Sequence, residues 1–225
     1  MFLVFDLDGT LIDGYAGIAH ALGFAMERLN VAPLPLERVR GMVGRGLERL
    51  LEEAVGAELA PRGVVLFRER YAEIADEETI LLPDVPDVLD RLRKGGHFMA
   101  VASNKPESFS RRILAGKGVA SHFLAVAGPD GETPPKPDPT MIFGLRERAG
   151  ATAEETVIVG DMEIDAETAL AAGCRCVLVP GGSRTAEELA AVPADAHLAR
   201  LAELPDAIER WSRTLRRAGP TIIGP

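Results

Sequence analysis

Four acidic residues directly follow two apolar runs of the chain, where they could bind a hard cation together. Asp6 and Asp8 belong to the segment FDLDGT, and Asp161 and Asp165 lie in the strand-to-turn region that begins at Gly160. Carboxylate oxygens suit Mg²⁺, which prefers a few carboxylates together with water and substrate phosphate. A carboxylate can also attack phosphorus, while a second carboxyl group protonates the leaving group and later activates water. The alternative is structural, because aspartate is also common in turns and at helix N-termini.

Three further polar residues could hold a phosphoryl group. Ser103 and Asn104 follow the apolar run 98–102, and a hydroxyl and an amide at a strand end can bind the oxygens of an anion. Both types also cap helices well, so a purely structural role stays open. Lys136 lies in the segment PPKPDP, whose prolines hold the backbone extended and so fix the position of the ammonium group. The alternative there is a proline-rich surface loop with a solvated lysine.

These residues need a fold that brings distant segments of the chain to one place. Short apolar runs alternate with amphipathic helical patterns, which is typical of an α/β fold with a doubly wound, mainly parallel sheet. In such a sheet, ligands bind beyond the carboxyl ends of the strands. The polar segments follow predicted strands or lie between them, so we expect them at one edge. The expected strands are 2–7, 98–103, 123–127, 156–160 and 176–179.

A long helical stretch interrupts this alternation after the first strand. The simplest account is an inserted α-helical cap formed by residues 15–79, with a core domain formed by residues 1–14 and 80–225. The last residues, 217–225, are expected to form a loose tail. The helical patterns of the cap occur at 18–29, 36–42, 46–55 and 64–74.

Composition excludes several classes of protein. The 225 residues include 34 acids against 25 lysines and arginines, a formal net charge of −9. So acidic a chain is a poor partner for nucleic acid or an anionic membrane surface. The run Met1–Phe5 is too short for a signal peptide, and no stretch approaches the roughly 18 apolar residues of a membrane span, so we expect a cytoplasmic protein. Cys174 and Cys176 cannot form a disulfide framework, and we expect two small buried thiols on a strand.

The polar segments, taken in order and spacing, resemble those of the haloacid dehalogenase superfamily and its phosphatases in particular. The resemblance implies that Asp6 is the nucleophile and a metal ligand. It implies that Asp8 is the general acid and base and binds Mg²⁺ through its main-chain carbonyl. Asp161 would bind the metal directly, and Asp165 would belong to the same metal site as a supporting residue. The phosphoryl-binding residues implied are Thr10, Ser103, Asn104 and Lys136.

The branch of the superfamily is suggested by two segments. FDLDGTLID and the cap segment Met42–Gly46 are similar to those of phosphoglycolate phosphatases. Arg45 opens a predicted helix and could receive a substrate carboxylate, or it could be an exposed loop charge. Gly14 stands where these phosphatases often carry serine. His20 lies seven residues after Asp13, whereas the cap histidine of related phosphosugar mutases follows after about five, so we expect a partly buried or surface histidine.

The sequence therefore predicts a Mg²⁺-dependent phosphatase that hydrolyses the phosphate monoester of a small metabolite through an aspartyl-phosphate intermediate. The substrate suggested by the resemblance is 2-phosphoglycolate. A phosphosugar mutase on the same scaffold is one alternative. A non-catalytic phosphate-binding regulator is another alternative. Such a protein would usually lack Asp6 or Asp8, and this chain has both.

Overall fold

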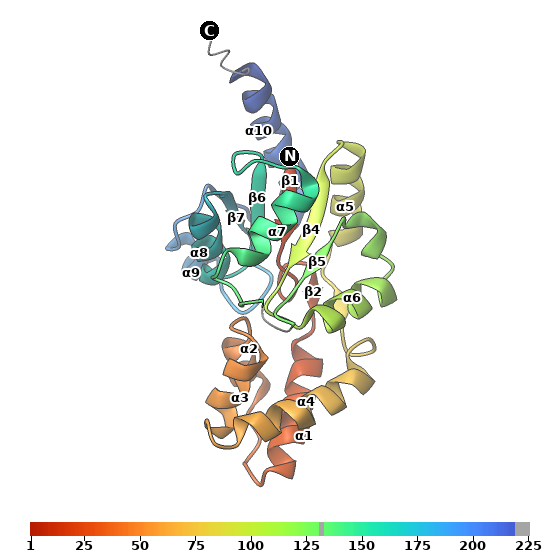
Figure 1. The fold of residues 1–225 in the computed structure, drawn as a ribbon, viewed down its shortest axis with the longest axis vertical. Coiled ribbons are helices and arrows are strands. Elements are labelled where there is room, and N and C mark those ends of the chain that lie inside the picture. The colour runs from red at the N-terminus through yellow and green to blue at the C-terminus, as the bar shows by residue number, and fades with distance from the viewer. Residues whose placement is uncertain (131–132, 219–225) are drawn as a thin grey trace.

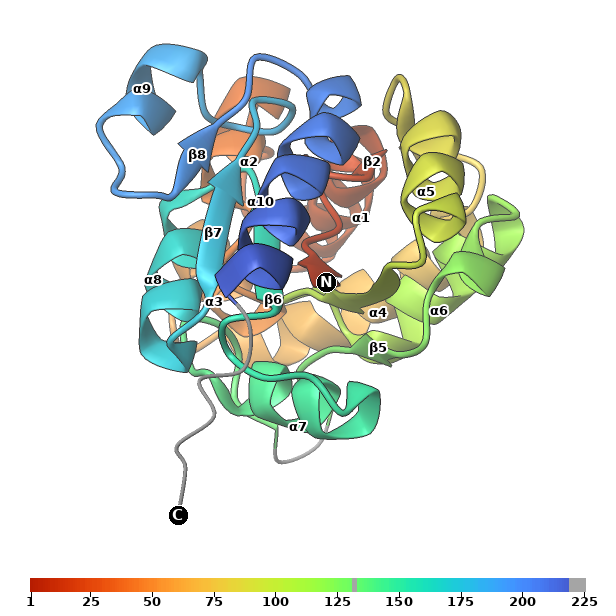
Figure 2. The ribbon, with the colours of Figure 1, turned by 90° about the horizontal axis from the view of Figure 1, so that it is seen from above.

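A six-stranded parallel sheet forms the centre of the larger part of the molecule (Figures 1 and 2). The computed structural model describes residues 1–130 and 133–218. The strand order is β5-β4-β1-β6-β7-β8, and every neighbouring pair is parallel. The predicted α/β fold is thereby confirmed. The strands are β1 (Phe2–Phe5), β4 (Phe98–Ala102), β5 (Val126–Ala127), β6 (Thr156–Gly160), β7 (Arg175–Leu178) and β8 (Ala196–His197).

Helices cover both faces of the sheet, which explains why β1 is apolar at every position. Leu3 and Phe5 belong to one core cluster, whereas Phe2 and Val4 belong to the other. The first cluster includes buried residues of α5 (Val85–Lys94), α6 (Glu107–Gly116) and α10 (Leu204–Ala218). The second includes residues of α7 (Thr140–Ala149), α8 (Glu163–Ala172) and α9 (Ala186–Ala190). Two 3₁₀ turns complete the core, η1 (Ala120–His122) and η2 (Leu201–Glu203).

Four helices form a cap at the edge of the sheet where the strands end (Figure 1). The chain enters and leaves it through a short antiparallel pair, β2 (Ile12–Asp13) and β3 (Ile80–Leu81). The buried residues of the cap helices continue the first core cluster. The division into a core of 1–14 and 80–225 and a cap of 15–79 stays a prediction. The cap helices are α1 (Tyr15–Arg28), α2 (Leu36–Met42), α3 (Leu47–Val55) and α4 (Ala60–Ile74).

The structure differs from the sequence expectations at a few element boundaries. The strand expected at 123–127 is only Val126–Ala127, and the strand expected at 2–7 ends at Phe5. At the carboxyl terminus, Arg217 and Ala218 belong to α10, and the rest of the expected tail lies outside the described residues. Within the described part of the chain, no helix has the length and apolar character needed to cross a membrane.

Candidate active site

The carboxyl ends of three neighbouring strands bring the predicted site residues together. Asp6 follows β1, Ser103 follows β4 and Asp161 follows β6. Main-chain hydrogen bonds extend the pairing beyond the strands, since Asp6 N donates to Val159 O at 2.8 Å. Because the strands are parallel, all three residues reach the same edge, and that edge faces the cap (Figure 1).

Lys136 lies between two of the carboxylates. Its Nζ is 2.8 Å from Asp6 Oδ1 and 2.6 Å from Asp165 Oδ1, and its side chain is 2% exposed. Burial by itself would lower the pKa of Lys136, but the Asp165 and Asp6 carboxylates raise it above its ordinary value. The ammonium group is therefore charged and fixed next to Asp6, as an anion site requires.

Asn104 holds the backbone of Lys136 in place. The main-chain N–H of Lys136 donates to Asn104 Oδ1 at 2.6 Å, and Asn104 Nδ2 donates to Lys136 O at 3.0 Å. Asn104 Nδ2 also donates to Gly44 O in the cap at 2.9 Å. The amide thus connects the end of β4, the lysine loop and the cap, instead of capping the helix that follows.

The two aspartates after β6 have different partners. Asp165 Oδ2 accepts from the main-chain N–H groups of Asp161 and Met162 at 3.2 and 3.1 Å, so this carboxylate fixes the turn. Burial raises the pKa of Asp165 to about 6, although Lys136 opposes the shift. Asp161 Oδ1 accepts from Thr10 Oγ1 at 2.9 Å, while its Oδ2 is buried without a hydrogen-bond partner among the described residues.

The surroundings of Asp161 do not favour the ionised form of its carboxyl group. Burial and the nearby carboxylates of Asp6 and Asp165 raise the pKa of Asp161 well above its ordinary value. The two nearby glycines are required for space: a Cβ at Gly9 would lie 2.3 Å from Asp161 Oδ2, and one at Gly182 would lie 1.8 Å from it. A cation that met this oxygen would stabilise the ionised form.

Three carboxylates at this place fit a hard divalent cation. One oxygen from each of Asp6, Asp161 and Asp165 lies within 4.8 Å of the others. Both oxygens of Asp165 already have partners, Lys136 Nζ for Oδ1 and main-chain N–H groups for Oδ2. Asp161 Oδ2, in contrast, is buried and has no hydrogen-bond partner in the described part of the chain. Asp6 and Asp161 are therefore the side chains best placed to bind the ion directly, and Asp165 is placed to support them.

Asp8 forms an ion pair with Lys105, a residue for which the sequence suggested no role. Asp8 Oδ2 is 3.0 Å from Lys105 Nζ, and Asp8 Oδ1 is buried without a partner among the described residues. Burial raises the pKa of Asp8, and Lys105 opposes the shift. Gly14 leaves room at this carboxylate, since a Cβ there would lie 2.8 Å from Asp8 Oδ1. The sequence feature that could have identified Lys105 is its position directly after Ser103 and Asn104, at the end of the same predicted strand.

The remaining candidates lie at different distances from this centre. Ser103 lines the pocket next to Asp6, and its Oγ accepts from the main-chain N–H of Lys105 at 3.3 Å. Arg45 is more than half exposed, with Nη2 3.4 Å from Glu163 Oε1. His20 is exposed, and its Nδ1 lies 2.7 Å from a carboxylate oxygen at the end of the cap. The structure thus brings Ser103 into the site and places Arg45 and His20 outside the pocket lining.

Known proteins resemble the chain in both sequence and structure. Residues 3–179 match the family model described as haloacid dehalogenase-like hydrolase. The phosphoglycolate phosphatase of Pseudomonas putida is 36% identical over 184 residues, which cover 78% of this chain and 67% of the relative. The phosphoglycolate phosphatase of Yersinia pseudotuberculosis is 32% identical over 213 residues, covering 92% of both chains.

A solved structure extends the likeness to the whole fold. A protein from Bacteroides fragilis, described as a haloacid dehalogenase-like hydrolase, superposes with a TM-score of 0.85 at 28% identity, over 90% of this chain and 98% of that one. The matched family segment contains Asp6, Asp8, Lys136 and Asp161, the residues that the structure brings together at the sheet edge. The chain therefore belongs to the haloacid dehalogenase-like hydrolase family and is a phosphatase within it.

Proposed function

We propose that this phosphatase is Mg²⁺-dependent and hydrolyses small phosphate monoesters through an aspartyl-phosphate intermediate on Asp6. The observation that carries the proposal is the convergence of Asp6, Lys136 and Asp161 at one buried edge, where Asp161 Oδ2 has no hydrogen-bond partner in the described part of the chain. A nucleophile, a fixed cation and a cation-seeking oxygen are the parts that phosphoryl transfer requires. The cytoplasm is the location that the sequence favours for such an enzyme.

The residues divide the reaction between them. The Asp6 carboxylate attacks phosphorus and the ester P–O bond breaks, while a proton from the Asp8 carboxyl goes to the leaving oxygen. In the second half, the Asp8 carboxylate takes a proton from a water molecule that attacks the phosphorus of aspartyl-phosphate. Inorganic phosphate then leaves and Asp6 is regenerated. The raised pKa of Asp8 suits a group that must hold and release a proton.

Positive charge offsets the repulsion between the Asp6 carboxylate and the phosphate dianion. Lys136 contributes part of it at 2.8 Å from Asp6 Oδ1. Asp6 and Asp161, with the Asp8 carbonyl and support from Asp165, would hold Mg²⁺, which supplies Lewis-acid stabilisation of the phosphoryl oxygens when bound. Ser103, together with Thr10 and Asn104 in the surrounding loops, would position the phosphoryl group or the residues that bind it.

The substrate proposed first is 2-phosphoglycolate, because relatives in Pseudomonas putida and Yersinia pseudotuberculosis are named phosphoglycolate phosphatases. The mutase alternative is not favoured. Its cap histidine would have to reach the pocket, whereas His20 lies between Glu78 and Arg70 and does not belong to the pocket lining.

Phosphate release from 2-phosphoglycolate tests the proposal. The purified chain should release inorganic phosphate with added Mg²⁺, and the Asp6→Asn variant, checked for its fold by circular dichroism, should not. Hydrolysis by Asp6→Asn at the wild-type rate would disprove the intermediate. Conversion of a sugar phosphate without phosphate release would favour the mutase instead.

A further inference from the structure

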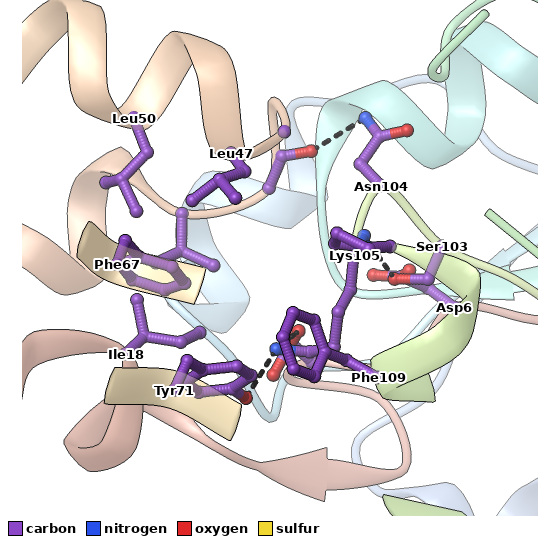
Figure 3. A pocket seen from close by; sticks show the side chains of 15 residues that line it. Asp6, Ile18, Leu47, Leu50, Phe67, Tyr71, Ser103, Asn104, Lys105 and Phe109 are labelled. Carbon is purple, nitrogen blue, oxygen red and sulfur yellow. Dashed lines mark hydrogen bonds and ion pairs between the residues drawn. The ribbon is translucent and has the colours of Figure 1, made fainter. Parts of the chain in front are cut away.

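The pocket beside Asp6 and Asp8 has two chemically different walls (Figure 3). The volume of the pocket is about 550 Å³, including the part that is open to solvent. The core wall is polar and carries Asp6, Ser103 and Asn104. The opposite wall consists of apolar side chains, which come mainly from the cap: Ile18, Val43, Leu47, Leu50, Phe67 and, from α6, Phe109.

Lys105 lies where the two walls meet. Among the described residues that line the pocket, it carries the one cationic side chain. Its Nζ donates to Tyr71 OH at 2.8 Å and is 3.0 Å from Asp8 Oδ2. An ammonium group has three N–H donors, so the contacts within the described residues leave one donor for a ligand. The side chain is 6% exposed and lines the pocket, so a ligand bound there could accept this donor away from most of the solvent.

Aromatic packing fixes the position of Lys105. Tyr71 stacks on Phe67, with ring centroids 5.2 Å apart, and meets Phe109 edge to face at 5.0 Å. The Lys105 ammonium also lies 4.7 Å from the centre of the Tyr71 ring. A cation held by an aromatic cluster cannot swing out to solvent, so it can select a ligand anion by position.

We propose that the enzyme prefers O-phosphorylated 2-hydroxy acids that carry an apolar substituent on carbon 2. This inference rests on the proposed phosphatase function and narrows its substrate class. The phosphoryl group lies at Asp6, the carboxylate accepts the free donor of Lys105, and the substituent packs against the apolar wall. 2-Phosphoglycolate shares the phosphoryl and carboxylate groups of this class but has no substituent on carbon 2, so it leaves that wall uncovered and should be a poorer substrate.

The same walls disfavour sugar phosphates. A polyhydroxylated leaving group would place its hydroxyls against Leu47, Leu50 and Phe67, which offer no hydrogen-bond partner. Burying a hydroxyl without a partner is unfavourable. Arg45 provides no alternative cation within the pocket, since its guanidinium pairs with Glu163 and is not among the groups that line this space.

Four esters separate the features of this class. The reference is 2-phosphonooxybutanoate. Propyl phosphate has the same carbon chain without the carboxylate, 2-phosphoglycerate has a hydroxyl in place of the terminal methyl, and 2-phosphoglycolate has no substituent. With Mg²⁺, we expect kcat/KM for propyl phosphate and for 2-phosphoglycerate to be lower than the reference by about tenfold or more. For 2-phosphoglycolate we expect a decrease of about fivefold to tenfold.

The Lys105→Met variant tests the residue itself. We expect the ratio of kcat/KM between the reference and propyl phosphate to fall from about tenfold or more to near one. Lys117→Met is the matched control: Lys117 donates to Asp76 O at the cap boundary and lies outside the pocket lining, so its loss should leave the ratio unchanged. If Lys105→Met does not fold, the wild-type ratios decide alone.

The outcomes separate the two proposals. Equal kcat/KM for the reference and propyl phosphate, or a preference for 2-phosphoglycerate over the reference, would overturn the substrate class. So would an unchanged ratio in folded Lys105→Met. In each case, Asp6-dependent hydrolysis of p-nitrophenyl phosphate would show that the phosphatase function stands. Absence of hydrolysis of all five esters would overturn both.

Discussion

The two walls of the pocket are built by different physical means. The core wall consists of polar groups held at strand ends, and Lys136 supports it from outside the pocket lining: this lysine lies between Asp6 and Asp165, and Asn104 is bonded to its backbone. The cap wall depends on aliphatic and aromatic packing, continuous with the core cluster. Charged groups at fixed distances can stabilise one reaction, whereas an apolar surface selects by shape and size. In the proposed function, the sheet edge would therefore carry out the chemistry and the cap would select the leaving group.

The largest effect is expected when the core wall loses its nucleophile. Asp6→Asn keeps the size of the side chain but removes the charge that attacks phosphorus and pairs with Lys136. We expect kcat to fall by at least about 10⁴-fold. Single-turnover phosphate release measures it, and thermal unfolding serves as the control for the fold. Residual activity within tenfold of wild type would remove Asp6 from the chemistry.

Metal removal should be nearly as damaging. Asp161 Oδ2 is buried without a partner in the described residues, so the site is expected to need a cation for charge balance. Treatment with EDTA should lower the rate by at least about 10³-fold. Added Mg²⁺ should restore it, and a titration gives the half-saturating concentration. Full activity after removal of the metal, verified by elemental analysis, would contradict the role of the carboxylate cluster.

Gly182→Ala should have an intermediate effect because it displaces the Asp161 carboxylate next to the core wall without removing a charged group. The new Cβ would lie 1.8 Å from Asp161 Oδ2 and 2.7 Å from Tyr15 OH, so the carboxylate must move. We expect kcat/KM to fall by about 10²-fold and the Mg²⁺ requirement to rise. Gly144→Ala is the matched control, since its Cβ would meet no atom within 4 Å. If the two variants needed the same Mg²⁺ concentration for half-maximal activity, the close contact between residue 182 and Asp161 Oδ2 would be refuted.

Arg45→Ala should have the smallest effect and tests the limit of the cap wall. Its exposed ion pair with Glu163 contributes at most about 1 kcal/mol to stability. We expect kcat/KM for 2-phosphoglycolate to change by less than about twofold. Arg38→Ala, which breaks another exposed pair in the cap, provides the comparison. A tenfold loss confined to Arg45→Ala would instead place this guanidinium against the substrate.

The core wall was more accessible to sequence reasoning than the cap wall. Asp6, Ser103 and Asp161 follow apolar runs that could be recognised as strands, and parallel strands must end at one edge. The two-residue strands β2, β3 and β8 were missed, because so short a segment has no periodicity.

The individual hydrogen bonds and ion pairs between distant residues could not be predicted from the sequence. Asn104 bonds the Lys136 backbone across 32 positions, and Arg45 meets Glu163 across 118. An amide or a guanidinium group can bind many kinds of partner, so the partner that it contacts becomes known only from the folded structure. The role of Lys105 was missed for this reason, since its partners Asp8 and Tyr71 come from the first strand end and from the cap.

The β2–β3 pair has a consequence for how the enzyme can change. Ile12 pairs with Leu81 and Asp13 with Ile80, so the two ends of the cap segment are held side by side. A segment inserted between adjacent ends closes a loop that the scaffold has already formed, and the entropy of closure rises only slowly with length. Caps of other lengths could therefore be exchanged at this point while the sheet and its carboxylates stay as they are. The β2–β3 pair is therefore a point at which one cap could be replaced by another, so that the same sheet edge would act on other substrates.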